Sequence, residues 1–302
     1  MHHNTDIIMT YDNLWRRLGA IYEAGEAKAI VRTLLEEKYG LSLADILCGG
    51  VEQMSAERLA MLGEDTERLM KAEPLQYVLG FEWFCCHRFG VAPGVLIPRP
   101  ETEWLVGRAV EIAGGTTSGQ RILDIGTGSG CIATSIWLAT HEKEADAEDK
   151  RTGGSATVEA WDISPEALAI AEANARALGA DVSFRRRDAL KAEFCHDERP
   201  WDIIVSNPPY ICLSERRDMS DNVLDYEPHT ALFVPDDDPL LFYRSIAAYA
   251  LQSLRRGGTL LFECNTAYAG DTREMLEKTG FDGVALVDDC FGKPRFVEAR
   301  RG

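Results

Sequence analysis

The sequence predicts an α/β protein in which a small helical bundle precedes a mostly parallel, doubly wound sheet. Two observations predict this fold. Apolar residues recur at helical spacing over about the first 85 residues, and beyond residue 100 short apolar strands alternate with helical segments. Such alternation produces parallel strands covered by helices. Because 302 residues suffice for one large core and a small one, we place a helical domain at residues 1–85 and an α/β domain at residues 86–302.

The helical domain is expected to contain three long helices and a short one. Gly40 and the Gly49-Gly50 pair are stop signals, and Ser42 begins the short helix. No catalytic constellation is apparent in this domain, so its expected role is recognition of a partner. The long helices are expected at Tyr11–Ala24, Glu26–Lys38 and Ser55–Lys71.

An extended, turn-rich segment is expected at residues 83–100, across the start of the α/β domain. Residues 141–156 are expected to form a charged surface insertion. The last two expected strands form a closing hairpin around Gly292. The strands are expected at Arg121–Ile125, Thr157–Trp161, Val182–Phe184, Asp202–Ser206, Leu260–Glu263, Val284–Val287 and Phe296–Ala299. The helices are expected at Glu101–Ala113, Cys131–Thr140, Ser164–Leu178, Pro239–Leu254 and Thr272–Lys278.

Composition limits the classes of function that the chain can have. The net charge of the chain is −17, whereas nucleic-acid-binding proteins typically present clustered basic residues. The charge therefore favours a protein or small-molecule substrate. No apolar run reaches the roughly 20 residues of a membrane helix, and the N-terminus resembles no signal peptide. None of the eight cysteines forms a C-x-x-C motif. We therefore expect a cytoplasmic protein with no metal site and no membrane contact.

A glycine-rich turn follows the first expected strand of the α/β domain. The segment Leu123–Gly130 reads D-x-G-x-G-x-G from Asp124 onward, and glycines there let the backbone turn sharply and approach a ligand. Asp124 would repel a pyrophosphate but suits a cationic ligand such as the methionine part of S-adenosylmethionine. We assign to this cofactor the turn residues Gly126, Thr127, Gly128, Ser129 and Gly130.

Two further strand ends carry carboxylates. Asp162 ends the second strand, where a carboxylate reaches ribose hydroxyls in nucleoside-binding folds. A helix-capping role for Asp162 is the alternative. Asp188 and Ala189 end the third strand, where the carboxylate and neighbouring backbone suit an adenine amino group; a solvated turn is the alternative there.

The fourth strand leads into Asn207, Pro208, Pro209 and Tyr210. Two prolines stiffen the loop and remove backbone donors. The Asn207 side-chain oxygen and the Pro208 carbonyl then form a pair of acceptors for a planar NH2 group, on which Tyr210 can stack. We assign catalysis to these four residues, with Asn207 also bordering the cofactor.

With these motifs the chain resembles the HemK/PrmC family, the peptide chain release factor glutamine methyltransferases. The resemblance implies a Rossmann-like class I methyltransferase domain with a seven-stranded, mostly parallel sheet. We expect the protein to be a monomer. It also implies transfer from S-adenosylmethionine to the glutamine of a Gly-Gly-Gln loop in class-one release factors. The resemblance rests on Gln76–Gly80, Gly94–Glu103, Asp124–Gly130, Asn207–Tyr210, Tyr226–Pro228 with Ala231-Leu232, and Asp289–Arg295.

Two departures and three alternatives remain. The insertion at 141–156 is longer than the family pattern, and Phe262–Asn265 lacks a glycine often found there. A ribosomal-protein glutamine methyltransferase is one alternative, but that group tends to carry Pro-Arg-Ser-Pro instead of the Pro98–Glu103 sequence. A DNA adenine methyltransferase is the second, because Asn-Pro-Pro-Tyr suits adenine equally well. A non-enzymatic nucleoside-binding protein is the third.

Overall fold

The computed structural model describes residues 9–115, 119–145, 156–194 and 199–302. Contacts divide the chain into two units. One comprises Met1–Phe81 together with Ser220–Tyr226, and the other comprises Glu82–Met219 together with Glu227–Gly302. The segment around Tyr226 thus belongs with the helical unit, where its hydroxyl donates to the Lys71 carbonyl at 2.8 Å.

The helical unit contains the four expected helices and two short ones that were not expected, at Leu75–Leu79 and Asp221–Tyr226. Ser42 begins the short helix in a capping box with Asp45, as expected. The prediction of one helix through Ala24 is wrong: the first helix ends at Leu18, because Gly19 caps it and the chain turns before the next helix. The helices are α1 (Tyr11–Leu18), α2 (Ala24–Glu37), α3 (Leu43–Leu47), α4 (Ala56–Leu69), α5 (Leu75–Leu79) and α9 (Asp221–Tyr226).

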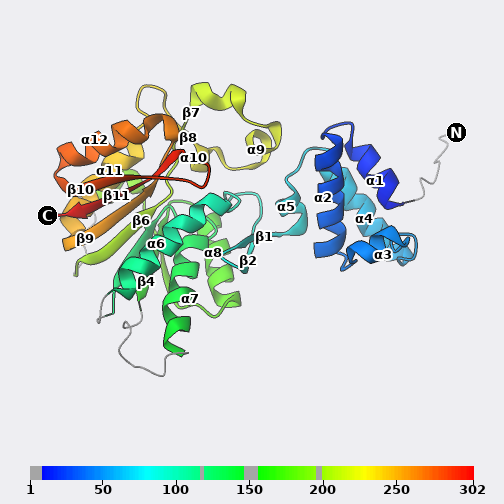
Figure 1. The fold of residues 1–302 in the computed structure, drawn as a ribbon, viewed down its shortest axis with the longest axis horizontal. Coiled ribbons are helices and arrows are strands. Elements are labelled where there is room, and N and C mark those ends of the chain that lie inside the picture. Colours follow the sequence, from blue (N-terminus) through cyan, green and yellow to red (C-terminus); the bar gives the residue numbers. More distant parts are fainter. Residues whose placement is uncertain (1–8, 116–118, 146–155, 195–198) are drawn as a thin grey trace. The chain divides into compact units, whose positions relative to one another are not determined.

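The larger unit is built on a seven-stranded sheet in the order β10-β11-β9-β6-β3-β4-β5 (Figure 1). The run from β9 to β5 is parallel, and β11 lies antiparallel to both β9 and β10. The predicted seven-stranded, mostly parallel sheet is therefore confirmed. Its strands are β3 (Arg121–Ile125), β4 (Thr157–Asp162), β5 (Val182–Arg186), β6 (Trp201–Ser206), β9 (Leu254–Glu263), β10 (Phe281–Asp288) and β11 (Pro294–Arg301).

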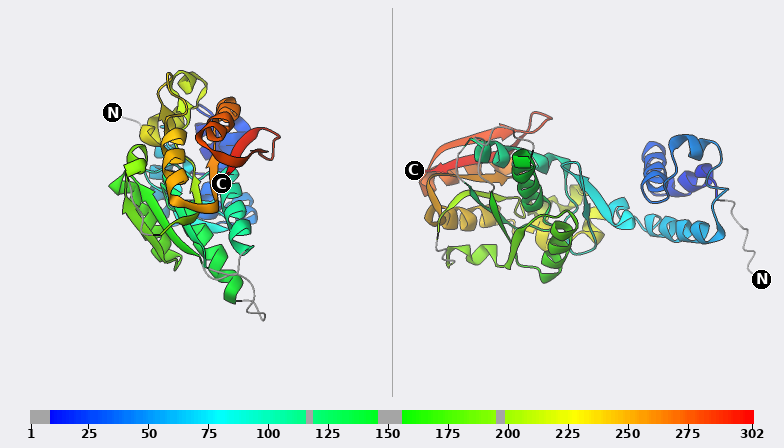
Figure 2. Two further views of the ribbon diagram at one scale, coloured as in Figure 1. Left: turned by 90° about the vertical axis from the view of Figure 1, so that its left-hand side faces the viewer. Right: turned by 90° about the horizontal axis from the view of Figure 1, so that it is seen from below.

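Helices cover both faces of this sheet (Figure 1, Figure 2). Alternate residues of β3 enter different cores: Leu123 packs in the cluster beneath α11 and α12, whereas Ile122 packs in the cluster beneath α6 and α7. This two-sided burial explains why the strands read as continuous apolar runs. The helices are α6 (Glu103–Gly114), α7 (Cys131–Ala145), α8 (Pro165–Ala177), α11 (Leu241–Ser253) and α12 (Ala269–Thr279).

Several short elements fall in segments that carry no periodic signal. α7 continues to Ala145, so residues 141–145 are helical and not part of a loop insertion; residues 146–155 lie outside the described residues. Within the described ranges, no helix is long and apolar enough to cross a membrane. The short elements are the strands β1 (Phe81–Phe84), β2 (His87–Gly90), β7 (Ile211–Cys212) and β8 (Phe233–Val234), the helix α10 (His229–Leu232), and the 3-10 turns η1 (Pro100–Thr102), η2 (Ala189–Phe194), η3 (Leu213–Asp218) and η4 (Thr266–Tyr268).

The helical unit contains a buried ionic contact. Asp65 on α4 accepts from Lys38 Nζ at 2.8 Å and from the Tyr39 hydroxyl at 2.7 Å. The Asp65 side chain is only 7% exposed, and burial together with this carboxylate raises the pKa of Tyr39. Removing Asp65 would leave a buried hydroxyl and a partly buried ammonium without this acceptor.

We therefore expect Asp65→Ala to lower the free energy of unfolding by about 3–5 kcal/mol, the usual cost of breaking a buried ion pair. Urea unfolding followed by circular dichroism measures it. Glu64→Ala, which changes the exposed neighbour on the same helix, is the control and should leave the transition unchanged. Equal midpoints for the two variants would contradict a stabilising role for Asp65.

Candidate active site

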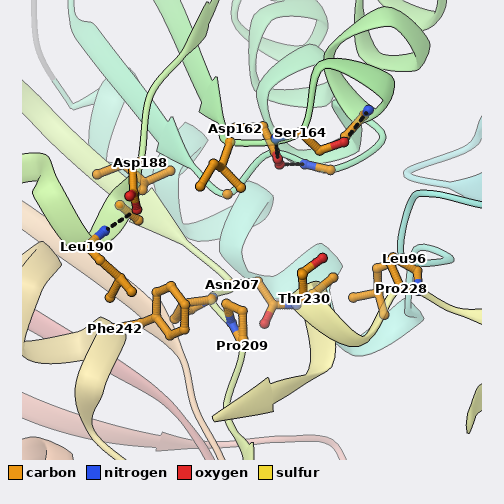
Figure 3. Close-up of a pocket in the computed structure, with 18 of the residues that line it drawn as sticks. Leu96, Asp162, Ser164, Asp188, Leu190, Asn207, Pro209, Pro228, Thr230 and Phe242 are labelled. Atoms are coloured by element: carbon orange, nitrogen blue, oxygen red, sulfur yellow. Dashed lines mark hydrogen bonds between the residues drawn. The ribbon is translucent and has the colours of Figure 1, made fainter.

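A pocket of about 390 Å³ opens at the carboxyl ends of the central parallel strands. The register of β3 with β4 and β6 makes these strands end at one edge, where doubly wound sheets bind ligands. Asp162 and Asp188 lie on one side of the pocket, and Asn207 and Pro209 face them from another (Figure 3). The pocket thus brings together residues assigned from the sequence to the cofactor and to the methyl acceptor.

The glycine-rich turn forms part of the pocket wall. Gly126 and Gly128 line it and adopt positive φ angles of 79° and 54°, which L side chains rarely adopt. Asp124 lies beneath the turn, fully buried, and accepts from the Thr127 hydroxyl at 2.6 Å. Burial raises the pKa of Asp124 to about 7. Asp124 and Thr127 therefore support the turn from below instead of lining the pocket.

The last two turn residues pack against α8. A Cβ on Gly130 would lie 2.9 Å from the Ala171 Cβ, and the Ser129 carbonyl accepts from Asn174 Nδ2 at 2.8 Å. Gly130 also has a positive φ of 78°. Ser129 and Gly130 thus lie behind the wall, where they allow the start of α7 to approach α8 closely.

Asp162 joins the turn to β4. Its Oδ2 accepts from the Gly128 N–H and its Oδ1 from the Ser164 N–H, both at 2.9 Å. Burial raises the pKa of Asp162. Each carboxylate oxygen has more than one lone pair, so Asp162 can support the turn and still accept from a ligand hydroxyl. The capping and ribose-binding roles considered for it are compatible.

Asp188 and Ala189 line the pocket at the end of β5. Asp188 Oδ1 accepts from the Leu190 N–H at 2.9 Å (Figure 3), and the Ala189 carbonyl accepts from the Ser245 hydroxyl at 2.7 Å. Ser245 lies on α11, so this helix holds the segment after β5 in place. The carboxylate again retains acceptor capacity toward the pocket.

The loop after β6 supplies three of its four predicted catalytic residues to the pocket wall: Asn207, Pro208 and Pro209. Tyr210 is not among the residues that line the pocket, and its hydroxyl donates to Glu263 Oε1 at 3.1 Å. Burial raises the pKa of Glu263, while hydrogen bonds from Thr102 and Tyr210 and the charge of Arg295 act in the opposite direction. Tyr210 therefore contacts a buried carboxylate behind the wall.

Two segments line the pocket without a chemical role assigned from the sequence. Residues Gly94–Leu96 form one part of the wall, and Pro228 with Thr230 and Ala231 form another. Glu227 connects them: its buried carboxylate accepts from the Ile97 N–H at 3.1 Å and pairs with Arg99 at 2.5 Å. Only the family resemblance singled out these segments, because their contact spans about 130 positions in the sequence.

Comparisons with known proteins agree with this architecture. The family model described as "PrmC N-terminal domain" matches residues 16–80, and the one described as "Methyltransferase domain" matches residues 116–285. A release factor glutamine methyltransferase of Bacteroides thetaiotaomicron is 45% identical over 93% of this chain and 95% of its own length. This chain belongs to the release factor glutamine methyltransferase family. A second member, from Flavobacterium psychrophilum, is 36% identical over 93% of this chain and 94% of its own length.

This family member is an S-adenosylmethionine-dependent methyltransferase. Its fold is also that of the T. thermophilus 16S rRNA N2 G1207 methyltransferase in complex with AdoMet and guanosine. That structure is 17% identical, with a TM-score of 0.50 over 74% of this chain and 50% of that chain. The pocket fits the cofactor, since it offers small-molecule volume, a glycine turn and two carboxylates. Among the described residues, no group of three or more His, Cys, Asp or Glu could hold a metal ion.

Gly126, which lines the pocket, and Gly130, which packs against α8, should respond differently to substitution by alanine. We expect Gly130→Ala to lower the free energy of unfolding by roughly 2–4 kcal/mol, from positive-φ strain and overpacking against Ala171. Gly126→Ala, which has open space around it, should cost only about 1–2 kcal/mol but weaken cofactor binding, because its methyl group enters the pocket. Chemical unfolding and calorimetry separate the two; identical behaviour of the variants would contradict this assignment.

Asp162→Ala should weaken S-adenosylmethionine binding at least tenfold, because charge-assisted hydrogen bonds contribute about 1.5–3 kcal/mol each. Isothermal titration calorimetry gives the dissociation constant. Asp181→Ala, which changes an exposed carboxylate before β5, is the matched control. Unchanged affinity in Asp162→Ala would remove this residue from the cofactor site.

Proposed function

We propose that this enzyme methylates the side-chain amide nitrogen of the glutamine in the Gly-Gly-Gln loop of class-one peptide chain release factors. The observation that carries this proposal is the position of Asn207 and Pro208 in the wall of the cofactor pocket. Their oxygens are acceptors on a stiff loop, suited to a planar NH2 group. We propose a release factor as the substrate because the family members that match this chain over most of their length are release factor glutamine methyltransferases.

The chemistry follows from the acceptor pair. An amide nitrogen is a poor nucleophile, because its lone pair is delocalised into the carbonyl group. Acceptance of both N–H bonds by Asn207 Oδ1 and the Pro208 carbonyl fixes the nitrogen and raises its electron density. Positioning of this kind contributes roughly 7–11 kcal/mol to lowering a barrier.

The transfer itself balances without another reactant. When bound, S-adenosylmethionine would supply the methyl group: a nitrogen–carbon bond would form as the sulfur–carbon bond of the sulfonium breaks, with S-adenosylhomocysteine as the leaving group. The amide nitrogen would then carry the positive charge and lose one proton to solvent. Asp162, Asp188 and Ala189 would hold the nucleoside part of the cofactor, beside the turn formed by Gly126 and Gly128.

A DNA adenine acceptor is the second candidate, because adenine also presents a planar NH2 group. The net charge of −17 argues against it, since nucleic-acid affinity depends on neutralising phosphates. A ribosomal-protein glutamine is the third, and the names of the family members argue against that one. We therefore favour the release factor over both.

The remaining assignments also belong to this proposal. Residues 1–85 would recognise the protein substrate, because their helices carry no catalytic constellation. The enzyme would act as a cytoplasmic monomer without direct contact to nucleic acid or membrane. The release factor is thus its expected partner, recognised by a protein surface and presented to the Asn207 loop.

We expect Asn207→Ala to lower kcat at least a hundredfold while changing cofactor affinity less than threefold, because positioning of a reacting group contributes several kcal/mol. The assay incubates enzyme, release factor and methyl-labelled cofactor and locates the label by mass spectrometry. The label should lie on the glutamine of the Gly-Gly-Gln loop, and a Gln→Ala release factor should stay unlabelled. Labelling of DNA adenine, with none on the release factor, would overturn the proposed acceptor.

A further inference from the structure

A series of hydrogen-bonded polar side chains connects the end of β9 with Asn207, in the loop after β6. Glu263, the last residue of β9, accepts from the Thr102 hydroxyl at 2.7 Å on Oε2 and from the Tyr210 hydroxyl at 3.1 Å on Oε1. The Glu263 side chain is 2% exposed and Thr102 is 3% exposed. Thr102 Oγ1 also lies 3.3 Å from Asn207 Nδ2. A carboxylate, a hydroxyl and an amide are thus joined in series.

The direction of each hydrogen bond follows from the number of protons available. An ionised carboxylate only accepts, and a hydroxyl has one proton to donate. Burial raises the pKa of Glu263, but Arg295, 4.0 Å from Oε1, and the two hydroxyl donors oppose this shift and favour the carboxylate form. Burial raises the pKa of Tyr210 above its ordinary value, so that its hydroxyl keeps a proton to donate.

Thr102 therefore gives its proton to Glu263 and has only lone pairs left for Asn207. The amide of an asparagine has a donating end and an accepting end, and its orientation is decided by its partners. A partner that only accepts selects the NH2 group. The NH2 group of Asn207 is held behind the wall by Thr102, which leaves Asn207 Oδ1 for the pocket.

We propose that Thr102 is a specificity-determining positioning residue, which orients the Asn207 amide so that its oxygen faces the methyl acceptor. The inference rests on the proposed function, because it concerns how that site tells an NH2 group from an oxygen. With the amide locked, the site accepts a donor such as glutamine and repels the carboxylate of glutamate. With the amide free to turn, Asn207 can present its NH2 group and this discrimination weakens.

Thr102→Val tests the proposal, since valine matches threonine in shape and lacks the hydroxyl. We expect kcat for a release factor to fall about 10- to 100-fold, the effect of losing one buried hydrogen-bonding partner. The dissociation constant of S-adenosylhomocysteine should change less than twofold. A release factor with Gln→Glu in the Gly-Gly-Gln loop, used as a competitor, should inhibit the variant more strongly than the wild-type enzyme, relative to the Gln form.

Thr102→Ser keeps the hydroxyl and should retain kcat and selectivity within about threefold of the wild-type values. Thr102→Ala repeats the loss of the hydroxyl with a smaller side chain, in case valine impairs folding. Loss of kcat and selectivity in the valine or alanine variant but not in the serine variant supports the proposal. Equal kcat and equal Gln/Glu selectivity in wild-type and hydroxyl-free enzyme would overturn it.

The same experiment distinguishes the proposed function from the proposed role of Thr102. Absence of wild-type transfer to the release factor contradicts the proposed function, whatever the variants do. Wild-type transfer combined with unchanged transfer and selectivity in Thr102→Val contradicts only the orienting role of Thr102. A uniform loss in all three variants, serine included, would show that Thr102 matters through packing and would also overturn the orienting role.

Discussion

The carbonyl oxygen of Trp161 accepts from the N–H groups of both Gly126 and Thr127, at 2.8 and 2.9 Å. This pair of hydrogen bonds joins the turn after β3 to the end of β4, where Ile125 and Trp161 are register partners. The Trp161 side chain is buried in the core beneath α11 and α12, so the carbonyl is held by packing. The position of Asp162, the next residue, and its contact with Gly128 depend on this arrangement. The side of the pocket proposed to bind the cofactor is thus shaped by backbone, anchored by one buried aromatic residue.

The side of the pocket proposed to bind the methyl acceptor is shaped by side chains. Glu263 receives hydroxyl protons from Thr102 and Tyr210, and Asn265 Nδ2 donates to the Tyr210 carbonyl at 3.2 Å. Glu227 similarly holds two wall segments through its contacts with Ile97 and Arg99. Buried carboxylates are costly unless every oxygen finds a donor. Each of these two carboxylates accepts from donors in separate parts of the chain. Substitution of one donor is therefore expected to disturb the segment that carries the other donor.

Local pattern explains which parts of this architecture were predictable. The apolar runs of β3, β4 and β6 and the Ser164 cap of α8 are signals within a few residues, and the structure confirms them. Two such strand ends and the glycine-rich turn predict a pocket at the carboxyl edge of the sheet. The pocket lining includes Asp162, Asp188 and Asn207, which the sequence also selected. Their roles toward cofactor and acceptor stay predictions.

Distant contacts explain what was not predictable. The hydroxyl of Tyr210 donates to Glu263, 53 residues later, and no local pattern predicts this contact. The same holds for Thr102 and Glu263, which are 161 residues apart. The end of the first helix at Leu18 is a different case, because Gly19 is a local stop signal that competes with a continuing apolar pattern.

The contrast between the two sides of the pocket bears on specificity. A 16S rRNA methyltransferase has the same fold at 17% identity, so the fold alone does not decide which acceptor is methylated. Backbone contacts such as that of Trp161 tolerate many side chains and can persist across such distances in sequence. Discrimination between an amide and another acceptor requires particular side chains in a particular orientation. In the site proposed here, these side chains are Glu263, Thr102 and Asn207, so a change of acceptor preference should begin with them.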